Sequence, residues 1–270
     1  YRLQFNFRYQ GAGTIGSAFT AVNPNLIEPQ LLLQQIEENP IQWRIGISYL
    51  NGSDAGGSTS SILPIVGLRM HLSHSLEVGA EFEPKHKLIG LRELLATNLF
   101  YSPLVVSVTM SQDSLFRGDT RRIVSEPIHI SAFANYFLSV ADELHAELRY
   151  IERKNEPVFA EHADTKGHVI FDATPENTRR LEFEAGGSSL LFVKDKLTTS
   201  LLFRSASVKG KETAIAFEPN LEIHANYEFA GLSEQFISSI EFTHLPRSKR
   251  SLTFDHLNPG YLARHRLQLT

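Results

Sequence analysis

The first ten residues, YRLQFNFRYQ (residues 1–10), alternate strictly between apolar and polar side chains. In an extended chain, Tyr1, Leu3, Phe5, Phe7 and Tyr9 share one face, and the residues between them carry charges, amides or other polar groups. A period of two that persists over ten residues predicts a β-strand with one apolar face and one polar face.

The same alternation recurs along the whole chain, in stretches near the 9–11 residues that a tilted strand needs to cross a bilayer. We expect further strands near residues 41–49, 62–72, 76–84, 93–100, 104–111, 127–139, 144–152, 179–193, 197–208, 213–229, 236–245 and 260–270. The sequence therefore predicts an all-β fold, a transmembrane antiparallel β-barrel of about 12–14 strands. Residues 1–270 are expected to form this single domain.

The expected connections between these strands alternate in length. Short links such as SHS at 73, ADE at 141 and KDK at 194 alternate with longer ones, among them residues 51–61 and 153–178. The VKGKE stretch near residue 210 is the exception and predicts a tight turn. Short turns on one side and long loops on the other are typical of outer-membrane barrels. The pattern predicts a location in the outer membrane of a Gram-negative bacterium, with membrane lipids and lipopolysaccharide as surroundings.

Composition limits the other classes. The 270 residues are 42% hydrophobic and 21% charged, and the net charge of −4 gives no reason to expect a nucleic-acid partner. We find no segment of eighteen or more uncharged apolar residues, so no transmembrane helix is expected. The chain has no cysteine, which excludes disulfides, thiolate metal sites and cysteine nucleophiles.

Residues 11–40 interrupt the alternation. Glycines near the start of this stretch predict tightly turning backbone, and residues 29–38 suggest a short helix that begins at Pro29. We expect the segment to fold into the barrel as a plug, or to form an excursion outside it.

The stretch FNFRYQGAGTIGSAFTAV (residues 5–22), followed by NPNLIEPQL (residues 23–31), resembles the N-terminal signature of the FadL-like (long-chain fatty acid transporter) superfamily of outer-membrane barrels. The resemblance implies a hatch inside the barrel. The hatch residues that it implies are Gly11, Gly13, Gly16, Ala18 and Phe19.

Charged residues on the polar faces are expected to line the lumen, because Arg or Lys facing the bilayer midplane costs roughly 2–4 kcal/mol. The two signs nearly balance, and cross-strand pairs between them can fill a narrow interior, which favours a small or closed pore. The predicted pore-lining residues are Arg2, Arg8, Arg44, Arg69, Glu77, Glu81, Glu147, Arg149, Glu182, Glu184, Glu222, Glu228, Arg264 and Arg266.

Few residues suggest catalysis or metal binding. His71 and His74 are three apart, so on a strand they would face opposite sides, and the sequence predicts neither a metal site nor a cofactor. Ser73 beside them lacks a convincing third group for a lipase-like triad, so no catalytic residue is expected. The basic residues Arg247, Lys249 and Arg250 indicate a solvated loop or a contact with lipopolysaccharide phosphates.

Three functions remain open on the sequence alone. The first is a channel or transporter for a small or amphipathic compound. The second is a structural or assembly barrel with a closed, charged lumen, which would anchor a protein partner in a periplasmic or surface complex. The third is a soluble periplasmic β-protein.

Overall fold

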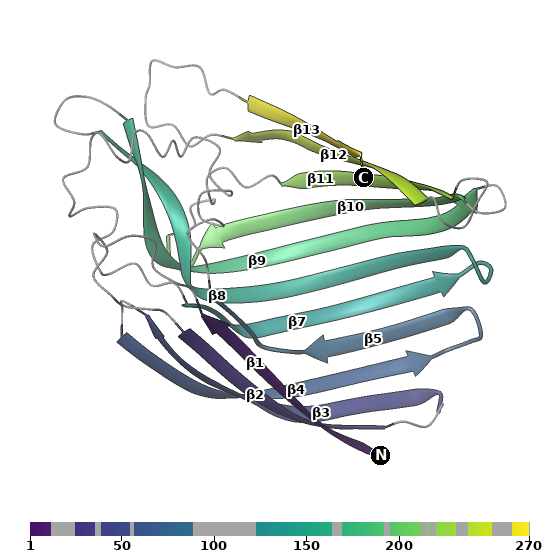
Figure 1. Ribbon diagram of the computed structural model, residues 1–270, viewed down its shortest axis with the longest axis horizontal. Helices are drawn as coiled ribbons and strands as arrows, with labels where there is room; N and C mark the ends of the chain where they lie inside the picture. The colour runs from purple at the N-terminus through teal and green to yellow at the C-terminus, as the bar shows by residue number, and fades with distance from the viewer. Residues whose placement is uncertain are drawn as a thin grey trace.

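The computed structural model describes residues 1–11, 25–35, 39–54, 57–88, 123–163, 169–191, 195–211, 215, 220–230, 237–249 and 261–269. These residues form one antiparallel sheet of thirteen strands (Figure 1). The strands are β1 (Arg2–Gly11), β2 (Asn25–Gln34), β3 (Ile41–Asp54), β4 (Gly57–His71), β5 (Leu76–Phe82), β6 (Lys85–Leu88), β7 (Ile123–Phe137), β8 (Glu143–Ala163), β9 (Val169–Leu191), β10 (Asp195–Val208), β11 (Leu221–Ala230), β12 (Ile237–Lys249) and β13 (Tyr261–Leu269).

Strands that follow one another in the chain lie side by side in the sheet. The single departure in the described strands is that β5 and β6 both pair with β7, so thirteen strands occupy twelve positions. Pro84 lies between β5 and β6, after the last residue of the chain segment that pairs with β4. The predicted antiparallel all-β fold is confirmed.

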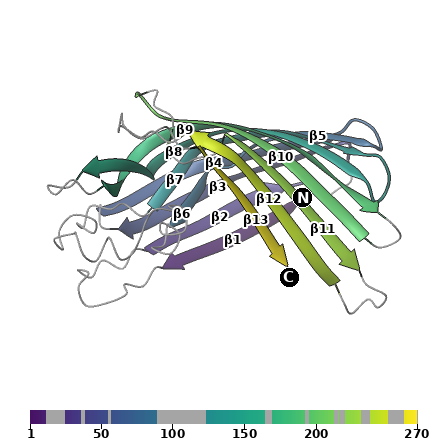
Figure 2. The same ribbon diagram turned by 90° about the horizontal axis from the view of Figure 1, so that it is seen from above.

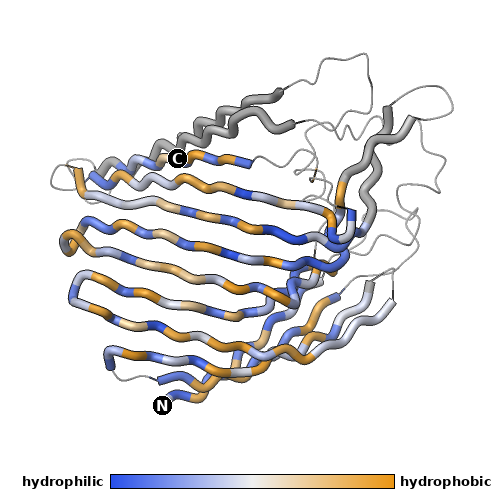
Figure 3. The backbone as a smooth tube through the Cα atoms, turned by 180° about the vertical axis from the view of Figure 1, so that it is seen from behind, coloured by the Kyte–Doolittle hydropathy of each residue, from blue (hydrophilic) through white to orange (hydrophobic). Residues whose placement is uncertain are grey.

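The period of two sorts the side chains onto two faces. Cross-strand register brings apolar residues together on one of them, for example Ile47 opposite Leu31 on β2 and opposite Pro64 on β4. Many of these side chains are exposed, including Phe5 at 67% and Ile62 at 68%. Figure 3 shows the alternation of hydrophobic and hydrophilic residues along the strands. An exposed apolar face of this extent suits lipid rather than water.

The sheet is curved. Seen from above, it curls so that β1 and β13 lie on the same side of the middle strands (Figure 2). Within the described part of the chain, β1 pairs only with β2, and β13 only with β12. Contacts from the polar residues of β1 to β6 cross the hollow, so the polar face is the concave one.

Prolines and bulges mark the places where the strands bend. The register of β7 with β8 shifts between Ser125 and Ile128, beside Pro127, and that of β8 with β9 shifts between Arg153 and Glu156. In the second bulge Asn155 has a φ of 58°, a left-handed conformation that Asn tolerates better than most residues. A bulge adds one residue to a strand, so the residues beyond it change from one face of the sheet to the other.

The predicted helix over residues 29–38 is wrong for the described part of that stretch. Residues 25–34 form β2, which pairs with both β1 and β3. Its alternation is hidden because Leu26 and Leu32 are buried on the concave face while Leu31 and Leu33 belong to the other face. An apolar residue on both faces removes the period-two signal. Residues 25–34 therefore belong to the sheet itself and not to a plug inside it.

Two predicted loops are also wrong. Strand β3 continues to Asp54 and pairs there with Gly57, so residues 51–61 are mostly strand. Strands β8 and β9 extend through most of residues 153–178. At 21 residues, β8 is roughly 70 Å long, more than twice the hydrocarbon thickness of a bilayer. The predicted long connections on one side of the sheet are therefore formed in part by strands that continue beyond their expected ends.

Several expected turns and strands have definite outcomes. The turn near residue 210 is confirmed, with Gly210 at a φ of 85°, and the short links at 72–75 and 138–142 join β4 to β5 and β7 to β8. Of the strand expected over residues 213–229, the part from Leu221 onward belongs to β11. The strands expected at 93–100 and 104–111 lie outside the described residues.

Candidate functional site on the concave face

A row of mostly charged residues crosses the concave face, one residue from each of seven neighbouring strands. We call it the charged row. Each member is the register partner of the next: Arg44 (β3), Gly67 (β4), Glu81 (β5), Ser131 (β7), Arg149 (β8), Glu182 (β9) and Arg204 (β10). The small residues Gly67 and Ser131 separate charges that would otherwise be direct neighbours.

At the β3 end of the charged row, one arginine serves two carboxylates. Arg44 Nη2 lies 3.2 Å from Glu81 Oε2 and 2.7 Å from Glu83 Oε2. The arginine reaches them across Gly67, where an added Cβ would lie 3.3 Å from Arg44 Nε. A glycine at this position therefore leaves room for the bridge.

At the β8–β10 end, carboxylates outnumber the arginines. Arg149 lies 2.6 Å from Glu147 and 3.3 Å from Glu182, and it also donates to Glu184. On β10, Arg204 contacts Glu182 at 2.9 Å. The same side chain contacts Glu222 of β11 at 2.8 Å. This end is a continuous network rather than a set of separate pairs.

The two bulges add a second group of charges beside the row. They turn Glu126 and Glu156 to the concave face, which Arg153 already shares with Arg149 by alternation along β8. There Arg153 Nε donates to Glu126 at 2.6 Å. Nη1 of Arg153 contacts Glu156 at 2.9 Å, and Arg180 contacts the same carboxylate at 2.6 Å. Desolvation raises the pKa of Glu126, but the hydrogen bond from His129 and the nearby Arg153 outweigh it and lower the pKa to about 2.

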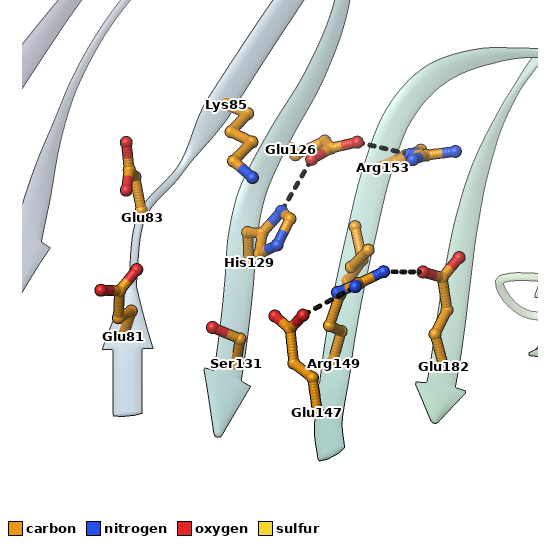
Figure 4. A pocket seen from close by; sticks show the side chains of 11 residues that line it. Glu81, Glu83, Lys85, Glu126, His129, Ser131, Glu147, Arg149, Arg153 and Glu182 are labelled. Atoms are coloured by element: carbon orange, nitrogen blue, oxygen red, sulfur yellow. Dashed lines mark hydrogen bonds and ion pairs between the residues drawn. The ribbon is translucent and has the colours of Figure 1, made fainter. Parts of the chain in front are cut away.

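Between these groups the concave face is hollowed into a cavity of about 440 Å³ (Figure 4). Ser131 lies at its middle, with Glu81 on one wall and Arg149 on the other. The lining residues are Glu81, Glu83, Lys85, Glu126, His129, Ser131, Glu147, Arg149, Ile151, Arg153 and Glu182. The cavity is thus polar on nearly all sides.

The concave face between β1 and β6 is filled instead of hollow. We call this region the packed end. Leu26, Leu50, Leu88 and Ile123 form a buried apolar cluster there. Leu26 and Leu50 on β2 and β3 meet Leu88 and Ile123 on β6 and β7, which are not their neighbours in the sheet. The curled sheet therefore closes on itself at this end.

Polar groups at the packed end also make contacts across the curled sheet. Arg8 on β1 donates to the carbonyl oxygen of His86, and Leu88 N donates to Gln10 Oε1 at 3.0 Å. Arg8 also lies 3.2 Å from Glu28, a carboxylate that is only 2% exposed. Ser48 donates a hydrogen bond to Glu28 at 2.8 Å.

The structure places the predicted pore-lining residues whose side chains it describes on the concave face and brings many of them together. Arg44, Glu81, Glu147, Arg149, Glu182, Glu184 and Glu222 belong to the network above. Arg8 belongs to the packed end. Arg69 lies 3.6 Å from Glu77 and over the ring of Phe133. Arg2 is exposed at the start of β1, and Glu228 accepts a hydrogen bond from Asn226.

Other predicted residues cannot be placed. The side chains of Arg264 and Arg266 lie outside the described residues, and so do the hatch residues Gly13, Gly16, Ala18 and Phe19. Gly11 is the last residue of β1 and pairs with Asn25, so it belongs to the wall. The hatch prediction is wrong for Gly11.

Sequence reasoning missed the second charged group. Glu126, Arg153, Glu156 and Arg180 were not among the predicted residues. Bulges change the faces of Glu126 and Glu156. Arg153 fell in the predicted loop, and Arg180 alternates with Glu182 along β9 but was not selected. Pro127 and Asn155 are the signals that could have indicated these bulges.

No protein-family model matches this sequence, and no curated protein sequence matches it. Solved structures do resemble the fold. The copper transporter OprC matches with a TM-score of 0.54 and 11% identity over 92% of this chain and 40% of its own. The FrpB iron transporter from Neisseria meningitidis matches with a TM-score of 0.54 and 10% identity, over 98% of this chain and 44% of its own.

A third similar structure is the siderophore receptor PirA from Acinetobacter baumannii, with a TM-score of 0.55 and 12% identity over 92% of this chain and 39% of its own. At such identities the likeness shows the fold alone, which is that of an outer-membrane β-barrel. The chain spans about two fifths of the length of these proteins. No helix among the described residues is long and apolar enough to cross a membrane.

Proposed function

We propose that the described strands form part of the wall of a transport barrel in the outer membrane of a Gram-negative bacterium, and that a small polar solute passes along their concave face. The observation that carries the proposal is the division of one sheet into an exposed apolar face and a charged face with a cavity of about 440 Å³. Lipid covers the first face, and water and solute occupy the second.

The similar structures support this proposal. They are a copper transporter, an iron transporter and a siderophore receptor. Because β1 and β13 each have one pairing side open among the described strands, we propose that the barrel contains more strands than these. An unpaired strand edge in lipid costs several kcal/mol per exposed polar group.

A polar solute fits better than an amphipathic one. Of the eleven residues that line the cavity, Ile151 is the single aliphatic one, and an amphipathic compound would require an extended apolar surface. The resemblance to the FadL-like superfamily concerns residues 5–31, most of whose central part lies outside the described residues. It remains a hypothesis about that segment alone.

The test is to insert the purified full chain into planar bilayers and record conductance, with entry of small sugars into liposomes as a second readout. We expect discrete conductance steps or solute entry. Protein unfolded by boiling, added to the same membranes, is the control. A folded protein that shifts on an unboiled gel but gives neither readout would overturn the proposal.

The packed end favours a second candidate, a structural barrel with a closed interior. Apolar cluster residues and the Arg8 contact to β6 fill that part of the concave face. Such a barrel would conduct no solute and would co-purify with a protein partner at a fixed ratio. Conductance by the isolated chain would exclude this candidate.

A further inference from the structure

We propose that the cavity between β5 and β9 binds a small organic cation with two or more amines. One amine would lie between Glu81 and Glu83 on the β5 wall, and another beside Glu147 on the β8 wall. The inference names a ligand class for the site assigned to transport above, so its role in passage rests on that proposed function. Binding itself can be measured separately.

The charge balance around the cavity favours a cation. The lining residues and their direct ion-pair partners include seven glutamates: Glu81, Glu83, Glu126, Glu147, Glu156, Glu182 and Glu184. Against these stand five cations: Arg44, Lys85, Arg149, Arg153 and Arg204. With His129 neutral, the cavity carries a formal excess of two negative charges. A bound dication would neutralise it.

The unneutralised charge lies on opposite walls. On the β5 side, Arg44 of β3 is shared between Glu81 of β5 and Glu83, which follows β5, and it contacts the Oε2 atom of each. On β8, Glu147 contacts Arg149 through Oε2. Among the described residues, Oε1 of these three glutamates accepts no hydrogen bond. Ser131, the small residue between the walls, leaves the space that separates them.

The arrangement suits amines better than an anion or a bare metal ion. An anion would need Arg149, but three carboxylates already occupy that guanidinium, and Lys85 is then the remaining cation at the rim. Among the described residues, no three His, Asp or Glu side chains are grouped closely enough to hold a metal ion. A volume of about 440 Å³ lies within the range of ligand pockets, about 300–1,000 Å³.

The experiment is isothermal titration of spermidine into the full chain, folded in detergent at low salt. We expect saturable binding that weakens as salt increases, because partly exposed charges are screened. The triple variant Glu81→Gln, Glu83→Gln, Glu147→Gln should bind at least tenfold more weakly. Glu77→Gln is the matched control, since Glu77 is on the same face of β5 but outside the cavity, and it should bind as the wild type does.

No spermidine binding by the folded wild type, or equal binding by the triple variant, would overturn the inference. A heat-modifiable gel shift shows whether each variant is folded. If the triple variant does not fold, the wild type still provides a test, since N-acetylated spermidine, which has lost amine charge, should bind more weakly than spermidine. Equal affinity for both would likewise overturn it.

The titration also separates the two proposals. Binding without conductance would leave the amine site standing and remove the transport function. Conductance without binding would leave transport standing and remove the amine site.

Discussion

The packed end and the charged row belong to the same sheet and follow the same alternation, yet one is filled and the other is hollow. At the packed end, Leu26, Leu50, Leu88 and Ile123 point inward and meet across the curled sheet. Along the charged row, glutamates and arginines point inward and pair with neighbours in the sheet. Whether the concave face closes therefore depends on which residues occupy inward positions, since the strand pattern is common to both.

The two regions are also stabilised differently. Apolar burial contributes roughly 25 cal/mol per Å², so the packed end should add to stability. Partly exposed ion pairs contribute little, typically about 0–1 kcal/mol each. We infer that the ion pairs of the charged row keep charges compensated in a watery interior, and that they are not what holds the sheet together.

Breaking the polar contact of the packed end should have the largest effect. Arg8→Met leaves the buried Glu28 carboxylate without its arginine and should lower the free energy of unfolding by about 2–4 kcal/mol. Urea unfolding in detergent, followed by tryptophan fluorescence, measures it. The double variant Arg8→Met, Glu28→Gln should recover most of the loss. An unchanged midpoint for the single variant would show that the packed end does not depend on this pair.

A pair of glycine substitutions compares the two regions directly. A Cβ at Gly52 would lie 2.6 Å from Ile123 Cδ1 and 2.9 Å from the carbonyl oxygen of Asn25, so Gly52→Ala should cost about 1–3 kcal/mol. At Gly67 the nearest atom would be the flexible Arg44 Nε at 3.3 Å, and Gly67→Ala should change stability by about 0.5 kcal/mol or less. Equal costs in the same urea assay would remove the distinction between a packed and an open region.

Acid should weaken the group formed at the bulges. Glu126 lies outside the part of the sheet whose outward residues are apolar, because the outward residue of β8 at the same height is Glu152. Its pKa is lowered to about 2, so its stabilising effect is present above its ordinary range near 4.5 and is lost as the pH falls toward 2. We expect a loss of about 1–2 kcal/mol over that window. Comparing melting temperatures at pH 6 and pH 3 checks it.

Glu126→Gln is the control for the acid effect, because it removes the titrating carboxyl and should reduce the pH dependence of melting. A variant that keeps the full wild-type pH dependence would assign the acid effect to other groups.

The smallest effect is expected for an exposed ion pair on the other face. Lys209 lies 2.7 Å from Glu152 and is 54% exposed. Lys209→Ala should therefore change the free energy of unfolding by about 0–1 kcal/mol. A larger change in the urea midpoint would show that the long-strand end contributes more to stability than its exposure indicates.

The sequence predicted correctly which residues lie on which face of the sheet where the two faces differ in polarity. Residues such as Ile45 and Arg44 on β3 could be assigned to faces from alternation alone, because burial in lipid and exposure to water demand opposite side chains. It failed on β2, where leucines occupy both faces, since an inward leucine has a partner that only the curled sheet provides. It also failed at Glu126 and Glu156, because a bulge adds a residue and reverses the pattern beyond it.

The central claim, lipid on one face and water on the other, can be tested most directly with single cysteines, because the natural chain has none. Thr199 on β10 belongs to the apolar face and Ser200 to the concave face. In liposomes, a membrane-impermeant maleimide should label the Ser200→Cys variant and leave Thr199→Cys unlabelled until detergent is added. Equal labelling of both variants in liposomes would contradict the account.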